Sequence, residues 1–145
     1  MSAGADPGPA GICILRRVEW MDTDAAGIWH WTTAMRFAEA AEAELHTALG
    51  IVDRTFGVTP RLAVAAEFRA PLRFNDLVRI DFRVDRVGRS SVAYAFTLAR
   101  DDVLAAEGRV TTCLVEGAGG RARPWPDDLR AALEHGGRRE PAPAA

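Results

Sequence analysis

The chain of 145 residues has no lysine, only two cysteines, and no apolar run near the roughly 18 residues that a membrane span needs. All 18 basic residues are arginine, against 20 acidic residues, so the formal net charge at pH 7 is -2. A charge balance so close to zero argues against nucleic acid or an anionic membrane as the partner. We attribute the missing lysine to a composition bias and assign it no function.

The two cysteines, Cys13 and Cys113, lie in apolar segments and have no Cys or His neighbour at zinc-ligand spacing. We therefore expect buried free thiols rather than a disulfide, and neither a metal ion nor a cofactor. The N-terminal residues lack the basic start and the apolar run of a signal peptide. The sequence thus predicts a cytoplasmic protein that does not enter a membrane.

The length fits one domain with a real core. Residues 1–11 and 135–145 are rich in Gly, Pro and Ala, so we predict flexible tails at both ends and a folded domain over residues 12–134. Within the domain, residues 12–20 are typical of a strand. Apolar residues then recur at helical spacing over residues 32–49, up to a glycine that ends the helix.

The predicted helix has an alanine-rich apolar face, on which only Phe37 and Leu45 are large. Four later runs alternate apolar and polar residues with period two, as half-buried strands do. They cover residues 62–68, 78–84, 92–98 and 104–114. Turns at residues 74–76, 87–89 and 100–102 each separate two of these runs, as short antiparallel hairpins require. Residues 125–134 are predicted to form a short helix that packs Leu129 and Leu133 on the body.

This order of elements predicts an α+β fold, in which a curved antiparallel sheet of about five strands wraps around one long central helix. The outer face of such a sheet stays partly apolar and its edges stay unpaired. Homodimerisation is therefore expected.

Residues 22–31, with the sequence DTDAAGIWHW, place acids, small residues and aromatics between the first strand and the helix. A carboxylate just upstream of a helix start lies near a row of unpaired backbone N–H groups. A base or nucleophile and a site for an oxyanion can thus form within a few residues. The stretch has the character of an active-site loop.

The order of elements and this loop together resemble the hotdog-fold acyl-CoA thioesterases, specifically the 4-hydroxybenzoyl-CoA thioesterase family, over residues 12–134. The strongest element is DTDAAGI at residues 22–28, which fits the family's Asp-x-Asp-x-x-Gly pattern. Weaker support comes from four shorter motifs. These are Thr59-Pro60, FRAPL at residues 68–72, Asn75-Asp76 and Gly88-Arg89-Ser90-Ser91.

The resemblance implies that Asp24 is the catalytic carboxylate. It would act either as a nucleophile that forms a mixed anhydride or as a general base that activates water. The family also implies that the backbone N–H of Trp31 polarises the thioester carbonyl. A helix N-terminus at that place agrees with the reasoning from the residues alone.

The resemblance also implies binding residues. Arg89 and Ser91 fall where the family contacts the nucleotide and pantetheine parts of coenzyme A, often across the dimer. Ser90 stands where one related type carries a basic residue. Thr59 occupies a position that lines the pantetheine channel in some members.

Other loop residues keep two interpretations. Gly27 either supplies a backbone shape and clearance for substrate or is an ordinary loop glycine. His30 belongs to a Trp-His-Trp triplet that departs from the family pattern; it either helps catalysis or is simply packed and hydrogen-bonded. Asp22 is expected to order the loop. The tryptophans at 20, 29 and 31 suit an apolar acyl pocket, and core packing explains them nearly as well.

Glu39 and Glu42 lie on the predicted helix, and a second branch of these thioesterases uses a helix glutamate in place of the loop aspartate. We favour solvated or dimer-facing acids at both positions.

The resemblance thus predicts a homo-oligomeric thioesterase, a dimer or a tetramer, that hydrolyses an aromatic or short to medium acyl-CoA. Two alternatives stay open. One is a thioesterase for an acyl-carrier protein; the other is a non-catalytic hotdog module that binds acyl or aromatic ligands. A hydratase is disfavoured because the Asp and His pairing of that branch is absent.

Overall fold

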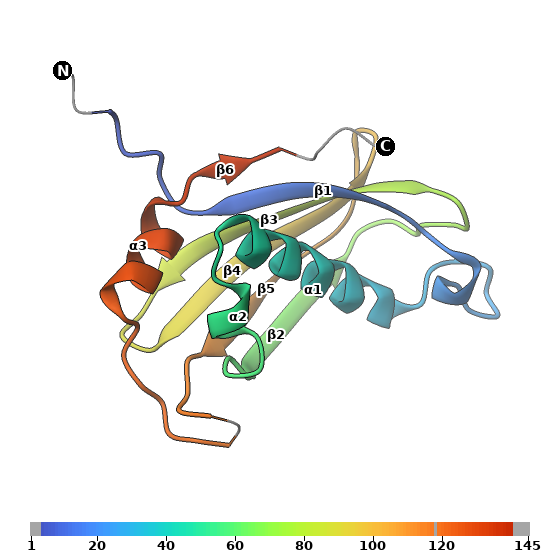
Figure 1. Cartoon of the computed structure of the whole chain (residues 1–145). Helices are drawn as coiled ribbons and strands as arrows, with labels where there is room; N and C mark the ends of the chain where they lie inside the picture. The colour runs from blue at the N-terminus through green and yellow to red at the C-terminus, as the bar shows by residue number, and fades with distance from the viewer. Residues whose placement is uncertain (1–3, 118, 141–145) are drawn as a thin grey trace.

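One sheet curves around one long helix in this chain, as the computed structural model of residues 4–117 and 119–140 shows (Figure 1). The elements in chain order are β1 (Gly11–Arg17), the 3-10 helix η1 (Trp20–Asp22), α1 (Trp31–Ala48), α2 (Val52–Thr55), β2 (Arg61–Phe68), β3 (Leu77–Val87), β4 (Ser91–Arg100), β5 (Val103–Cys113), α3 (Asp127–His135) and β6 (Arg138–Arg139). The predicted α+β architecture is confirmed.

The sheet has the strand order β2-β5-β4-β3-β1-β6. All neighbours are antiparallel except β1 and β6, which are parallel. The expected count of about five strands omits β6, and α2 was also not predicted. Both are too short to produce a periodic pattern.

The two tail regions are partly built into the fold. Ala10 is fully buried and its N–H donates to the Leu133 carbonyl at 2.9 Å, while Arg138–Arg139 pairs with the start of β1. Residues 1–3 and 141–145 of the predicted tails lie outside the described residues.

The core forms between α1 and the concave face of the sheet. The period-two pattern places the buried large residues of the strands on this face, among them Phe82, Tyr94 and Phe96. The alanine-rich stripe of α1 faces them, with Phe37 and Leu45 fully buried. Small side chains on this stripe let the helix lie close to the sheet.

Strand β2 is the exception to this burial. Helix α1 packs on β1 and β3, so the helix-facing side of β2 is left uncovered at the far edge of the sheet. Val64 and Phe68 on that side have exposed fractions of 44% and 45%. The predicted alternation holds from Ala63 to Phe68, where the apolar side chains line a groove instead of the core. A register shift between Arg61 and Ala63 breaks the alternation at Leu62.

Cys13 and Cys113 are buried free thiols, as expected. Within residues 4–117 and 119–140, no helix is both long enough and apolar enough to cross a membrane.

Candidate active site

The loop between η1 and α1 is a tight turn that carries Asp24 at its start. A β-bridge joins Thr23 to Trp29, and the Asp24 N–H donates to the Ile28 carbonyl at 2.9 Å. The Gly27 N–H donates back to the Asp24 carbonyl at 2.9 Å, and Gly27 has φ +80°. That backbone conformation favours glycine, whereas a Cβ there would meet nothing within 4 Å of this chain. Backbone shape is therefore a sufficient reason for glycine here.

Asp22 holds the loop against α1. Its side chain is only 3% exposed, forms an ion pair with Arg36, and accepts a hydrogen bond from the Glu19 N–H at 2.7 Å. Its carbonyl accepts from the His30 N–H at 2.7 Å and from the Thr33 hydroxyl at 3.1 Å. The expectation that Asp22 orders the loop is confirmed.

The Asp24 carboxylate is exposed and only half engaged. Its Oδ1 accepts a hydrogen bond from the Ala26 N–H at 2.8 Å, which fixes the carboxyl plane. No partner binds Oδ2 among the residues that the structure describes. Asp24 lines a hollow of about 500 Å³ whose walls include Trp29, Trp31 and Phe68. One carboxylate oxygen is thus available to a molecule bound in an apolar hollow.

Helix α1 begins at the same hollow. His30 is its N-cap, since the ring Nδ1 accepts a hydrogen bond from the Thr32 N–H at 3.2 Å. The Trp31 N–H follows and has no acceptor within the described part of the chain. An unpaired N–H at the positive end of an 18-residue helix attracts an anionic oxygen. The capping geometry supports the packed, hydrogen-bonded interpretation of His30.

A groove continues from this hollow along the side of α1. A second hollow of about 440 Å³ shares Trp31 and Phe68 with the first, and runs between Met35 on α1 and Val64 on β2 as far as Arg61. A third, of about 280 Å³, lies beyond Arg61; its lining residues include Glu39, Glu42, Phe56 and Thr59. Asp24 and Thr59 therefore stand near opposite ends of one groove.

Three of the four residues expected to contact coenzyme A lie elsewhere in the protomer, and only Thr59 lies in the groove. Arg89 and Ser90 form the turn between β3 and β4, and Ser91 begins β4, at the end of the sheet opposite the Asp24 loop (Figure 1). Trp125 anchors this turn: its backbone N–H donates to the Arg89 carbonyl at 3.0 Å and its indole N–H to the Ser91 carbonyl at 2.9 Å. One chain alone does not bring these three residues to Asp24.

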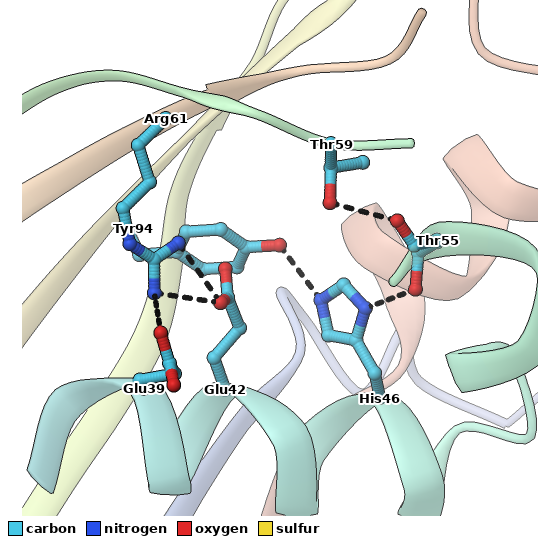
Figure 2. Close-up of polar contacts among 7 residues, drawn as sticks. All are labelled: Glu39, Glu42, His46, Thr55, Thr59, Arg61 and Tyr94. Carbon is cyan, nitrogen blue, oxygen red and sulfur yellow. Dashed lines mark hydrogen bonds and ion pairs between the residues drawn. The ribbon is translucent and has the colours of Figure 1, made fainter. Parts of the chain in front are cut away.

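A polar network missed by the sequence reasoning lies under the far end of the groove. Figure 2 shows the Arg61 guanidinium beside Glu39 and Glu42. Glu42 is only 4% exposed, and its Oε1 accepts from both terminal nitrogens of Arg61, at 3.0 and 3.1 Å. The expectation of a solvated acid holds for Glu39, whose side chain is 65% exposed, and is wrong for Glu42. Arg61 comes from a distant strand, and no local sequence signal pairs it with Glu42.

His46 occupies the next turn of α1 and links two hydroxyls. Its Nε2 lies 2.8 Å from the Tyr94 hydroxyl and its Nδ1 lies 2.6 Å from the Thr55 hydroxyl (Figure 2). The Thr55 hydroxyl donates its single hydrogen to the Ile51 carbonyl at 3.1 Å, so Nδ1–H must be the donor to Thr55. Nε2 then accepts from Tyr94, and the imidazole is neutral.

Burial dominates the electrostatics of this network. Desolvation lowers the pKa of His46 to about 4. It raises the pKa of Tyr94 well above its usual range, with the Glu42 charge acting in the same direction. It also raises the pKa of Glu42, and Arg61 opposes that shift. Thr59, next to this network, donates its hydroxyl to the Thr55 carbonyl at 2.8 Å.

A hollow of about 520 Å³ on the opposite face of the sheet has no part in this site. Its walls are small and charged residues, such as Ala65, Ala95 and Arg109, and none comes from the loop. Neither Asp24 nor the start of α1 lines this hollow, so the groove beside α1 is the better candidate.

Comparison with known proteins gives the family. A model described as the thioesterase-like superfamily matches residues 18–133. A 1,4-dihydroxy-2-naphthoyl-CoA hydrolase of Prochlorococcus marinus (strain MIT 9303) is 29% identical over 111 residues, which are 68% of this chain and 74% of the hydrolase.

Two solved structures are similar in fold. One is a gentisyl-coenzyme A thioesterase, with a TM-score of 0.72 and 25% identity over 83% of this chain and 98% of that one. The other is a 4-hydroxybenzoyl-CoA thioesterase variant complexed with 4-hydroxybenzoyl-CoA, with a TM-score of 0.75 and 19% identity over 86% of this chain and 99% of that one.

The chain belongs to the thioesterase-like superfamily, and its fold is the hotdog fold of these enzymes. The resemblance inferred from the loop and the element order is confirmed, and with it the prediction of a thioesterase.

Proposed function

We propose that this protein hydrolyses an acyl-CoA thioester, with Asp24 as the base or nucleophile and the Trp31 N–H as the oxyanion donor. The observation that carries the proposal is that a half-free carboxylate and an unpaired helix N-terminal N–H line one apolar hollow. Thioester hydrolysis needs these two groups and no others of unusual chemistry.

The step begins when the thioester oxygen accepts a hydrogen bond from the Trp31 N–H. Asp24 then either attacks the carbonyl carbon or takes a proton from a water that attacks it. Negative charge develops on the carbonyl oxygen at the positive end of α1, which stabilises the tetrahedral intermediate. Collapse of the intermediate releases the coenzyme A thiol. Where Asp24 attacks, water hydrolyses the resulting anhydride in a second step.

The acyl group we propose is aromatic or a short to medium chain. The walls of the hollow are aromatic and apolar, and the groove continues past Met35 and Val64. The hydrolase and the thioesterases described above are named for bulky aromatic acyl groups. A thioesterase of this family with aromatic walls is expected to take a related acyl class.

A two-fold dimer through β2 would complete the site. Antiparallel pairing of a strand with its own copy sets its Arg61 end beside the partner's Phe68 end. The turn that holds Arg89 lies at the Arg61 end, since Arg61 pairs with Thr112 and Thr112 with Val92. Arg89 of the partner subunit would then approach the Asp24 half of the groove. This arrangement reconciles the separation of Asp24 and Arg89 within one chain.

Thiol release from a panel of thioesters tests the function. We expect turnover of benzoyl-CoA and hexanoyl-CoA by the wild-type chain, detected as free coenzyme A. Faster turnover of the same acyl groups on an acyl-carrier protein would favour the carrier-protein alternative. Tight binding of the whole panel without any thiol release would support the non-catalytic module and contradict the proposal.

The oligomer is tested by a charge at the middle of β2. Ala65 is exposed, and a two-fold axis through the strand would set it near its own copy, so Ala65→Asp should produce like-charge repulsion. We expect the wild type to sediment at two or four times the 15.7 kDa of one chain and the variant at a smaller multiple. Ala99→Asp, on the interior strand β4, is the matched control and should keep the wild-type mass. Equal masses for all three proteins would rule out β2 as the interface.

A further inference from the structure

A β-bulge decides which residue of β2 faces the groove at its far end. The register of β2 against β5 shifts between Arg61 and Ala63, so Leu62 is the extra residue. Val64, Ala66 and Phe68 face α1, and strict alternation would place Leu62 on that side too. Instead Arg61 lines the groove, and Leu62 does not. The bulge thus exchanges an apolar side chain for a guanidinium in an otherwise apolar groove.

Arg61 stands at the junction of two hollows. It is the residue that the apolar hollow of about 440 Å³ and the polar hollow of about 280 Å³ have in common. Its guanidinium is fixed rather than free, because both terminal nitrogens bind Glu42 (Figure 2). A buried carboxylate that accepts two hydrogen bonds holds the planar group in one orientation.

The charges around Arg61 restrict what it can recognise. The guanidinium has two carboxylate neighbours, Glu42 at 3.0 Å and Glu39 at 3.6 Å. The two carboxylates outnumber the one guanidinium, so the cluster repels a further anion, and the guanidinium repels a cation. The arrangement suits an uncharged group that accepts a hydrogen bond from Arg61 and donates one to a carboxylate.

A buried polar group lies beside Arg61 in the sheet. Thr112 of β5 pairs across the sheet with Arg61, and its side-chain hydroxyl is buried without a hydrogen-bond partner in the described part of the chain. Buried hydroxyls are rarely left unpaired, because the loss costs about 1–3 kcal/mol. The alternation of β5 sets Thr112 on the same face as Val110, which lines the groove.

We propose that Arg61, oriented by Glu42, is a specificity-determining residue that binds an uncharged hydrogen-bonding group of the substrate, a hydroxyl or a secondary amide. The inference rests on the proposed thioesterase function and deepens it. Such a group has two sources in an acyl-CoA. Arg61 and Phe68 are seven positions apart on β2, a span of about 23 Å, which is close to the reach of a pantetheine arm with its two amides. In a β2 dimer, Arg61 of the partner subunit would instead meet the acyl group.

Three thioesters separate the two sources. Hexanoyl-CoA is the reference, 6-hydroxyhexanoyl-CoA adds a hydroxyl to the acyl end, and hexanoyl-N-acetylcysteamine removes most of the pantetheine arm. The variant is Arg61→Met with Glu42→Leu, which removes both charges together and leaves no buried charge unpaired. Leu62→Ala is the control at the bulge. Arg61→Lys keeps the charge without the planar fork, and it serves if the double variant does not fold.

We expect the double variant to lose about tenfold in the kcat/KM ratio of one pair, with the loss appearing in KM. Loss of preference for 6-hydroxyhexanoyl-CoA over hexanoyl-CoA assigns the acyl group. Loss of preference for hexanoyl-CoA over the cysteamine thioester assigns pantetheine. Leu62→Ala should keep both ratios, and Arg61→Lys should lose part of the affected one.

Unchanged ratios in the double variant and in Arg61→Lys would overturn the proposal. An equal loss for all three thioesters would also overturn it, because that result indicates general damage to the site. If the wild type hydrolyses none of the three, the thioesterase function itself has failed. Quenching of tryptophan fluorescence by the same three compounds then decides the binding claim alone, since Trp31 lines the groove.

Discussion

Asp24→Asn should lower kcat for hexanoyl-CoA and benzoyl-CoA by about 10³-fold and leave the fold intact. The amide keeps the size of the side chain and can still accept the Ala26 N–H, so the loop geometry survives. It cannot attack a carbonyl or take a proton from water, and removal of a base of this kind costs about 10²–10⁴ in rate. The measurement is thiol release under saturating substrate, with thermal unfolding as the check on the fold.

Asp22→Asn is the matched control two residues away. Asp22 is buried and binds Arg36, so its loss should appear mainly in stability, at about 2 kcal/mol, through the weakened contact to α1. Asp24 is exposed and should affect rate without affecting stability. The pair of variants therefore separates chemistry from loop order. Near-normal turnover in Asp24→Asn would refute the catalytic assignment, whatever the behaviour of Asp22→Asn.

The second large effect is an acid destabilisation that depends on His46. Its pKa is about 4 in the folded chain, against an ordinary value of 6.5 when unfolded. The unfolded state therefore binds more protons between these values, and stability is lost as pH falls from 6.5 towards 4. A shift of that size contributes about 3 kcal/mol to the free energy of unfolding, and this contribution is fully present above pH 6.5.

Denaturant unfolding across this pH window tests the effect. His46→Gln replaces the ring with a group that does not titrate and that can still bind a hydroxyl. The free energy of unfolding of the wild type should fall more steeply than that of the variant as pH falls from 6.5 towards 4. Below pH 4 the two slopes should become equal. Parallel curves would show that His46 titrates normally. Resonances of the neutral ring at pH 5.5 would give direct support.

Much of this fold is predictable because its signals are local. The alternation of residues 78–84 and 92–98 predicts strands, and the stripe with Phe37 and Leu45 predicts a helix. Leu129 and Leu133 likewise mark α3, and both are buried. Each pattern depends on one segment that packs against one surface.

The polar network escapes sequence analysis because its partners are far apart in the chain. Glu42 lies on the helix and Arg61 on a strand after it, and a register shift of one residue decides that they meet. His46 and Tyr94 are 48 positions apart. Sequence alone shows a glutamate beside an apolar stripe, where exposure is the ordinary expectation. The loop of Asp24 can be predicted from sequence because its acid, its glycine and the helix start are contiguous.

Strand β6 has a consequence for how copies of this chain can assemble. It covers Gly11 and Ile12 of β1, so one margin of the sheet is partly closed by the chain itself and β2 remains the long open margin. A sheet with two open margins can add copies without limit and grow into a fibre. Where only one margin is long and fully open, the first partner consumes the main site of growth. The two-residue strand β6 thus favours a closed particle over a filament.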